Sequence, residues 1–223
     1  MSRQIFDREL EKLQEDVLAL GSMVEKAIVV SVAALKRRDL ETSRRLIAAD
    51  REINKKRFAI ESDCLSLIAT QQPMAKDLRT LAAVLEIATE LERIADYAKG
   101  IAKITLMLGT EPLVKPLVDI PRMAEKVRDM LARSLDAFAL QDVELARAIP
   151  KEDDEVDCLY DQVYRELITY LLADPSAIQR ANCLLWVAHN LERAADRVSN
   201  ICERVVFTVT GELLEFDSDD AGV

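Results

Sequence analysis

Apolar residues in the first part of the chain recur at a regular spacing. They follow one another at alternating intervals of four and three residues, interrupted by one small serine, in the order Phe6, Leu10, Leu13, Val17, Leu20, Val24, Ala27, Ser31 and Ala34. An average spacing of ~3.5 residues is typical of a helix that packs along its length against nearly parallel neighbours. The pattern therefore predicts a first helix of about 30 residues, which would be ~45 Å long at ~1.5 Å per residue.

Turn-forming residues divide the chain after this helix. Asp39 is a suitable N-cap for a second helix, which we expect to run to about Thr70. The segment Gln71-Gln72-Pro73 stops that helix, and its proline suits the first residue of a third helix, where a missing N–H costs nothing. Gly109 is expected to end the third helix. Residues 110–121 hold three of the six prolines in the chain, so we expect a linker there.

The sequence after the linker repeats the sequence before it. The triplet Asp39-Leu40-Glu41 recurs 103 residues later as Asp142-Val143-Glu144. The segment Leu91-Glu92-Arg93-x-Ala95-Asp96 recurs 100 residues later as Leu191-Glu192-Arg193-x-Ala195-Asp196. Because order and spacing are kept over most of each half, we infer a tandem duplication of a three-helix unit.

The predicted fold class is therefore all-α, with two tandem three-helix bundles. The 5 Gly and 6 Pro of the chain are too few for a β-sandwich or barrel, which needs frequent turns. Pro150 is expected to kink the fifth helix or to delay its start. The expected boundaries are residues 1–109 for the first repeat, 110–121 for the linker, 122–211 for the second repeat and 212–223 for an acidic, disordered tail.

Composition argues against several kinds of partner and location. The chain has 223 residues and a formal net charge of −10, which disfavours nucleic acid because binding to a phosphate backbone depends on clustered Lys and Arg. The longest nearly apolar stretch, Ala27–Leu35, is too short to span a bilayer, and early charged residues argue against a secretory signal. The 4 cysteines show no paired spacing and are expected to be buried free thiols. We therefore expect a cytoplasmic protein that is not an integral membrane protein.

The available side chains also argue against an enzyme. The single histidine, His189, cannot supply the two Glu-x-x-His units of a ferritin-like di-iron site. A Ser–His–Asp or Cys–His centre would depend on the same residue. No glycine-rich loop that could hold a phosphate is found among the 5 glycines. We expect no catalytic residues and no nucleotide cofactor.

A pair of carboxylates recurs at equivalent positions in the two repeats. Glu92 and Asp96 lie one turn apart at the border of the apolar face of the third helix, and Glu192 and Asp196 take the same place in the sixth. Like charges at this spacing destabilise a helix by ~0.2–0.5 kcal/mol, so their repetition suggests a bound cation. Oxygen ligands suit a divalent or trivalent metal ion such as iron, zinc, manganese or magnesium. Further candidate ligands are Asp50, Asn54, Asp153, Asp157, Asn200 and Glu203.

An ion-pair network is the alternative explanation of these carboxylates. Arg93 and Arg193 are spaced to pair with Asp96 and Asp196 at i,i+3. Lys103 stands where the second repeat has a carboxylate, which weakens the case for a metal site in the first repeat. The spacing alone leaves metal binding and ion pairing both open.

Three segments resemble motifs of the PhoU family. They are Gln-Gln-Pro-Met-Ala-Lys-Asp-Leu-Arg at 71–79, Leu-Glu-Arg-Ile-Ala-Asp-Tyr-Ala at 91–98 and Asn-Leu-Glu-Arg-Ala-Ala-Asp-Arg-Val-Ser-Asn-Ile-Cys-Glu at 190–203. The resemblance covers the chain from about residue 3 to 210, although Ala95 and Ala195 stand where the family often has Gly. It implies the same fold of two three-helix repeats.

The resemblance also implies a function, that of a non-enzymatic negative regulator of the phosphate-starvation response. Such a protein would be an adaptor between the phosphate ABC transporter and a sensor histidine kinase at the inner face of the membrane, contributing to phosphate homeostasis. Metal clusters at Glu92, Asp96, Glu192 and Asp196 and a homodimer are further implications of the resemblance. The alternatives are a metal-dependent hydrolase that uses the carboxylate clusters, an accessory of a phosphate permease, and a structural coiled-coil partner.

Overall fold

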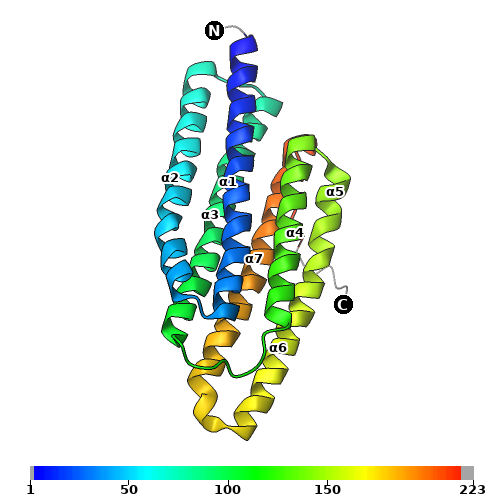
Figure 1. The fold of residues 1–223 in the computed structure, drawn as a ribbon. Coiled ribbons are helices and arrows are strands. Elements are labelled where there is room, and N and C mark those ends of the chain that lie inside the picture. Colours follow the sequence, from blue (N-terminus) through cyan, green and yellow to red (C-terminus); the bar gives the residue numbers. More distant parts are fainter. Residues whose placement is uncertain (1–2, 217–223) are drawn as a thin grey trace, which may run out of the picture.

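The computed structural model describes residues 3–216, and no strand occurs within them. Figure 1 shows two helical bundles side by side, α1–α3 and α4–α7, which confirms the all-α, duplicated fold. The helices are α1 (Arg3–Arg37), α2 (Leu40–Gln71), α3 (Lys76–Leu108), α4 (Asp119–Leu140), α5 (Val143–Ala148), α6 (Asp153–Ala173) and α7 (Ile178–Thr210), with 3-10 turns η1 (Ile149–Glu152) and η2 (Pro175–Ala177).

The duplicated N-caps form as the sequence predicts. The Asp39 side chain accepts a hydrogen bond from the backbone N–H of Thr42 at 2.9 Å, and Asp142 accepts one from Leu145 at 3.0 Å. Each aspartate thereby satisfies one of the N–H groups that the first turn of a helix leaves without an intrahelical partner. The helix that follows each cap therefore begins at equivalent places in the two repeats.

Of the two prolines expected to shape helix ends, one acts as predicted and the other does not. Pro150 divides the predicted fifth helix into α5, the turn η1 and α6, as expected of a ring that cannot continue the hydrogen-bond ladder. The expectation that Pro73 begins the third helix is wrong, because α3 begins at Lys76. Gln72 adopts a left-handed conformation (φ 48°) and caps α2 through its backbone N–H, and Ala75 also has a positive φ of 43°. The chain therefore reverses direction through Gln72 and Ala75 before α3 begins.

The first helix packs against both bundles. Val17, Leu20 and Val24 from its apolar seam are completely buried. Gly21 lies on the same face at the crossing with α4, where a Cβ would stand 2.1 Å from Cδ1 of Leu135. Glycine thus allows a close approach between α1 and α4, and the long seam serves the neighbouring repeat as well as its own bundle.

Helices α3 and α7 form the centre of the molecule and run in opposite directions (Figure 1). Arg197 lies 3.5 Å from Glu90, and Arg204 lies 2.9 Å from Glu86, farther along the same pair of helices. Gly100 permits a close approach of α3 to α7, since a Cβ at this position would lie 3.1 Å from Nδ2 of Asn190. The duplicated third helices therefore pack against each other, which places the two carboxylate motifs in one rigid helical core.

The connection between the repeats is shorter than the predicted linker and is anchored to the second bundle. It spans residues 109–118, and Pro121 lies in the first turn of α4. Lys115 is 5% exposed and pairs with Glu166 of α6 and, at 3.9 Å, with Asp119. A buried ammonium needs such partners because it has left water.

The predicted disordered tail needs correction at its beginning. Within residues 212–216, Leu214 and Phe216 pack on the hydrophobic core, whereas Leu213 is exposed. The backbone N–H of Phe216 donates to Oε1 of Glu203 at 2.9 Å. Apolar burial and this charge-assisted hydrogen bond hold the segment despite its acidic composition. Residues 217–223, with the remaining acidic positions of the tail, lie outside the described residues.

The structure modifies two expectations, that all cysteines are buried and that no apolar stretch is long enough to span a membrane. All four cysteines are free, and Cys64, Cys183 and Cys202 are buried, but Cys158 is exposed on α6. Helix α1 is long and apolar enough to cross a membrane by length and composition, contrary to our estimate for Ala27–Leu35. However, 44% of its most apolar 18-residue stretch is buried inside the molecule, and the core helix of a soluble bundle meets the same criteria.

Candidate carboxylate site

The carboxylates of the first repeat are joined by a lysine. Asp50 on α2 is 6% exposed, and its Oδ2 lies 2.6 Å from Nζ of Lys99 on α3. The same ammonium lies 3.2 Å from Oδ1 of Asp96. Asn54 donates a further hydrogen bond to Asp50 Oδ2 at 3.1 Å. Oδ2 of the buried carboxylate therefore accepts from two donors within the chain.

Glu92 lies within the electrostatic field of the same group. Its pKa is raised chiefly by burial, and then by the negative charges of Asp96 and Asp50, while Arg57 opposes the shift. A raised pKa means that the surroundings disfavour the ionised form of Glu92. Lys99 thus contacts Asp50 and Asp96, and Glu92 is near enough to these two carboxylates for their charge to affect its pKa.

The carboxylates of the second repeat lie beside a histidine and an arginine. Oε2 of Glu192 is buried, and Nδ1 of His189 lies 3.2 Å from it but outside hydrogen-bonding geometry. Nε of Arg193 lies 3.5 Å from Oδ2 of Asp196, which confirms the predicted i,i+3 ion pair there. The pKa of Glu192 is raised by burial first, and then by Asp196 and Asp157. The surroundings therefore disfavour the ionised form of Glu192, as they do that of Glu92.

His189 has a second set of neighbours, which are aromatic. Its ring lies edge-on to Trp186 with centroids 5.6 Å apart, and its centroid is 6.3 Å from that of Tyr160 on α6. This agrees with the packing role that is common for a histidine on a helix face. Its Nδ1 nevertheless faces the candidate site through Glu192.

Equivalent positions of the two repeats differ in charge. An offset of 103 residues on the second helices and 100 on the third helices relates the two groups. The first group has three carboxylates and one ammonium, a formal charge of −2, whereas the second has four carboxylates and none of the lysines, a formal charge of −4. Two pairs of equivalent positions account for this difference in charge: Asn54 in the first repeat corresponds to Asp157 in the second, and Lys99 corresponds to Ser199.

The chemistry of the two groups fits a metal ion unequally. Within residues 3–216, no three Asp, Glu, His or Cys side chains come together closely enough to hold a metal ion, so neither group is a preformed ligand cage. In the second repeat, the buried Glu192 oxygen has no hydrogen-bond donor, and an oxygen of this kind suits a hard cation. In the first repeat, an ammonium already contacts the central carboxylate. Metal binding therefore stays a prediction, and only the second group fits it.

Two predicted ligands lie elsewhere. Asn200 donates to Glu90 of α3 at 3.4 Å, and Glu203 accepts from the backbone of Phe216. Both line a depression with Glu86, Glu90, Arg204 and Glu215, between α3, α7 and the end of the described chain. Glu203 is eleven residues beyond Glu192, or ~16 Å along a helix, so the shared face does not bring the two together.

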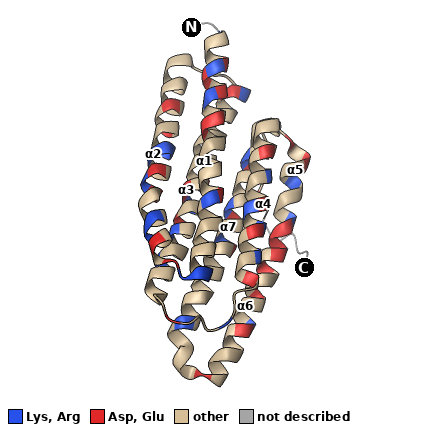
Figure 2. Ribbon diagram, in the orientation of Figure 1, with Lys and Arg blue, Asp and Glu red and all other residues tan. Residues whose placement is uncertain are grey.

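Sequence reasoning missed Lys99. Its i,i+3 spacing from Asp96 was the local signal that could have found it, and it takes the role that we assigned to Arg93. The contact with Asp50 has no local signal, because it joins two helices across 49 residues. Figure 2 shows that Lys and Arg are interspersed with Asp and Glu along both bundles, so a single charged neighbour was hard to choose.

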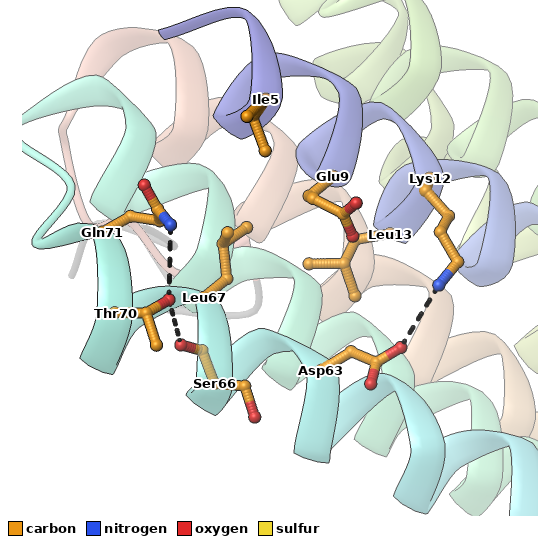
Figure 3. Close-up of a pocket in the computed structure, with 9 residues that line it drawn as sticks. All are labelled: Ile5, Glu9, Lys12, Leu13, Asp63, Ser66, Leu67, Thr70 and Gln71. Atoms are coloured by element: carbon orange, nitrogen blue, oxygen red, sulfur yellow. Dashed lines mark hydrogen bonds and ion pairs between the residues drawn. The ribbon is translucent and has the colours of Figure 1, made fainter. Parts of the chain in front are cut away.

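Another depression lies between the start of α1 and the end of α2. Figure 3 shows its residues, with apolar Ile5, Leu13 and Leu67 toward the helices and polar groups at the rim. The rim ion pair joins Nζ of Lys12 to Asp63 at 3.7 Å, and both side chains are more than half exposed. Such a contact contributes little to binding or stability, so this depression offers no chemistry that competes with the carboxylate groups.

A family model and curated relatives match almost the whole chain. The model described as PhoU domain matches residues 17–105 and again 120–205. A protein of Clostridium acetobutylicum named phosphate-specific transport system accessory protein PhoU homolog is 35% identical over 97% of this chain and 100% of its own length. A homolog of the same name from Caulobacter vibrioides is 38% identical over 94% of this chain and 91% of its own. The Escherichia coli protein named phosphate-specific transport system accessory protein PhoU is 34% identical over 93% and 86%.

Two solved structures have the same fold. The phosphate transport system regulatory protein PhoU from Streptococcus pneumoniae superposes with a TM-score of 0.87 at 34% identity, over 94% of this chain and 99% of that protein. PhoU from Pseudomonas aeruginosa superposes with a TM-score of 0.88 at 34% identity, over 93% of this chain and 100% of that protein. Both halves of the chain, with both carboxylate groups, lie within the similarity.

Proposed function

Because the chain belongs to the PhoU family, we propose that it is a regulatory adaptor of phosphate transport. In this role it works with a phosphate ABC transporter at the inner face of the membrane and restrains a sensor histidine kinase when phosphate is plentiful. The observation that supports it best is a similarity that extends over 97% of the chain and 100% of a relative named as a transport accessory protein. An accessory family of this kind is consistent with a protein that is not an enzyme.

The second bundle offers a surface that suits such an adaptor. A groove between the end of α6 and the start of α7 is lined mainly by apolar side chains, among them Tyr164, Ile168 and Ile178. Of these, Ile178 is 64% exposed. Large exposed apolar residues next to one another are typical of protein contacts, and an amphipathic partner helix fits a groove between two helices. We assign this surface to partner binding.

We further propose that the carboxylates of the second repeat bind one divalent or trivalent metal ion. Asp153, Asp157, Glu192 and Asp196 would supply the oxygen ligands, and small side-chain movements would complete the coordination. Support comes from the raised pKa of Glu192, since a cation would offset the burial that chiefly raises it and the repulsion from Asp196 and Asp157. When bound, the metal would supply positive charge that holds α6 to α7. The role is structural and does not require a reaction.

A deletion strain tests the regulatory role. Without the gene, a reporter driven by a phosphate-starvation promoter is expected to be active in phosphate-rich medium, and the wild-type gene should silence it again. A silent reporter in the deletion strain refutes the proposal. A variant with Ile178→Glu, in the groove, should fail to silence the reporter, whereas Leu213→Glu, at a similarly open position (71% exposed), should behave as wild type.

Experiments on purified protein test the proposed homodimer and the proposed absence of enzymatic activity. Light scattering should give twice the 25.1 kDa chain mass if the protein is a homodimer, and the chain mass alone would contradict that part. Phosphatase assays with added manganese, iron or magnesium should show no turnover. Activity that disappears in Glu192→Gln but persists in Asp161→Asn, a change at a 67% exposed side chain, would favour a hydrolase instead.

A further inference from the structure

The two carboxylate groups of the duplicated fold differ in how their charge is neutralised. We propose that Lys99 is a built-in counter-cation that closes the first repeat to metal ions, so that metal binding is confined to the second repeat. Only one part of this proposal, that metal binds in the second repeat, rests on the proposed function. The exclusion at the first repeat stands on contacts within that repeat.

The ammonium of Lys99 occupies the place that a metal would need. Its Nζ is 2.6 Å from Asp50 Oδ2 and 3.2 Å from Asp96 Oδ1, so it bridges α2 and α3 as a shared cation would. Hard metal ions bind carboxylate oxygens at ~2.0–2.6 Å, so an ion bound to the same oxygen would collide with the ammonium. A divalent ion placed nearby would also be repelled by its positive charge.

Burial makes the lysine difficult to displace. The Asp50 side chain is 8% exposed and that of Lys99 is 24% exposed, so neither group can regain full hydration without moving out of the helix interface. Asn54 fills another acceptor position of the same carboxylate. Two donors from the chain, Lys99 Nζ and Asn54 Nδ2, therefore share Oδ2 of Asp50, the oxygen through which the lysine bridges the two helices.

The second repeat lacks each of these features. Ser199 stands at the position of Lys99, is 1% exposed, and its hydroxyl has no hydrogen-bond partner among the described residues. Asp157 replaces the amide of Asn54, and Tyr160 replaces Arg57, which opposes the negative field at Glu92. The first group thus has an ammonium that bridges carboxylates of two helices, and the second group has a serine at the equivalent position.

The experiment isolates the first repeat in the full-length chain. Glu192→Gln and Asp196→Asn remove ligands of the second repeat, and Mn²⁺ binding to this background is measured by the EPR signal of the free ion at neutral pH. Adding Lys99→Ser, which makes the first repeat resemble the second, should tighten Mn²⁺ binding at least tenfold. Adding Asp50→Asn to that variant should abolish the gain, and Lys99→Arg should leave binding as weak as in the background.

The outcomes separate this proposal from the proposed function. Equal Mn²⁺ affinity with Lys99 and with Ser at position 99 overturns the counter-cation role, and so does tight binding to the background itself. Absence of Mn²⁺ binding by the wild type refutes the second-repeat site without affecting the gain expected from Lys99→Ser. If Lys99→Ser does not fold, Lys99→Gln is measured in its place, since it removes the charge while keeping a long side chain. An unchanged affinity in that variant also overturns the proposal.

Discussion

Replacing Asp50 by Asn is expected to weaken the contact between α2 and α3. Asn has nearly the same shape as Asp, so the change removes charge from the carboxylate that Lys99 and Asn54 share, without opening a cavity. The perturbation therefore tests the ion pair itself. The surrounding apolar packing of the first bundle is left in place.

The magnitude follows from burial and from the contacts that remain. Removing one member of a fully buried ion pair costs ~3–5 kcal/mol. Lys99 is 24% exposed and retains Asp96 as a partner at 3.2 Å, so the loss is smaller. Hydrogen bonds to charged groups contribute ~1.5–3 kcal/mol, and we expect Asp50→Asn to lower the free energy of unfolding by that amount. At ~2–4 °C for each kcal/mol in a chain of this size, Tm should fall by ~3–12 °C.

A double-mutant cycle with Lys99→Met, followed by urea unfolding, measures the coupling between the two side chains. The control is the pair Lys12 and Asp63, which is 3.7 Å apart with side chains 60% and 54% exposed. Exposed pairs of this kind give ~0–1 kcal/mol, and we expect the buried pair to exceed the control clearly. Equal coupling energies in the two cycles would refute the reasoning from burial.

The pH dependence gives an independent check. The hydrogen bond to Asp50 raises the pKa of Lys99 above its ordinary value of 10.5. A raised lysine pKa contributes stability that is complete below pH 10.5 and is lost as the pH rises through the folded value. The difference in unfolding free energy between wild type and Lys99→Met should thus stay constant from neutral pH to about pH 10 and shrink above it. A difference that does not change at high pH would contradict the ionic contribution.

Three further predictions concern packing and thiol chemistry. Gly21→Val should lower the free energy of unfolding by ~1–3 kcal/mol through overpacking between α1 and α4, measured by thermal unfolding, and a Tm equal to wild type would refute the close approach. Phe216→Ala should lower stability by ~1–3 kcal/mol because its ring packs on the core, while Leu213→Ala, at a 71% exposed position, should not; equal effects would contradict the placement of this segment. Maleimide at neutral pH should label exposed Cys158 first and spare Cys202, whose pKa burial raises to about 12; mass spectrometry that finds equal labelling would refute this.

The sequence predicted most of the fold because its signals are local. The spacing of apolar residues, the caps at Asp39 and Asp142, and the break at Pro150 depend on neighbours within a few residues, and each forms as expected. The start of α3 was misjudged, because a proline suits the first turn of a helix but does not compel a helix to begin there. Gln72 instead adopts a left-handed conformation and Ala75 a positive φ, neither of which a local signal required.

By itself, the sequence determined an all-α chain with two repeats and a recurrent carboxylate pair, because periodicity and duplication are properties of the order of residues. The tertiary structure alone decided which cation meets which carboxylate. Lys99 reaches Asp50 across 49 residues, and Glu203 turns to the backbone of Phe216 thirteen residues away instead of joining Glu192. The energy of a charged side chain depends on burial and on partners brought close by packing, and neither is encoded in the spacing of a single helix.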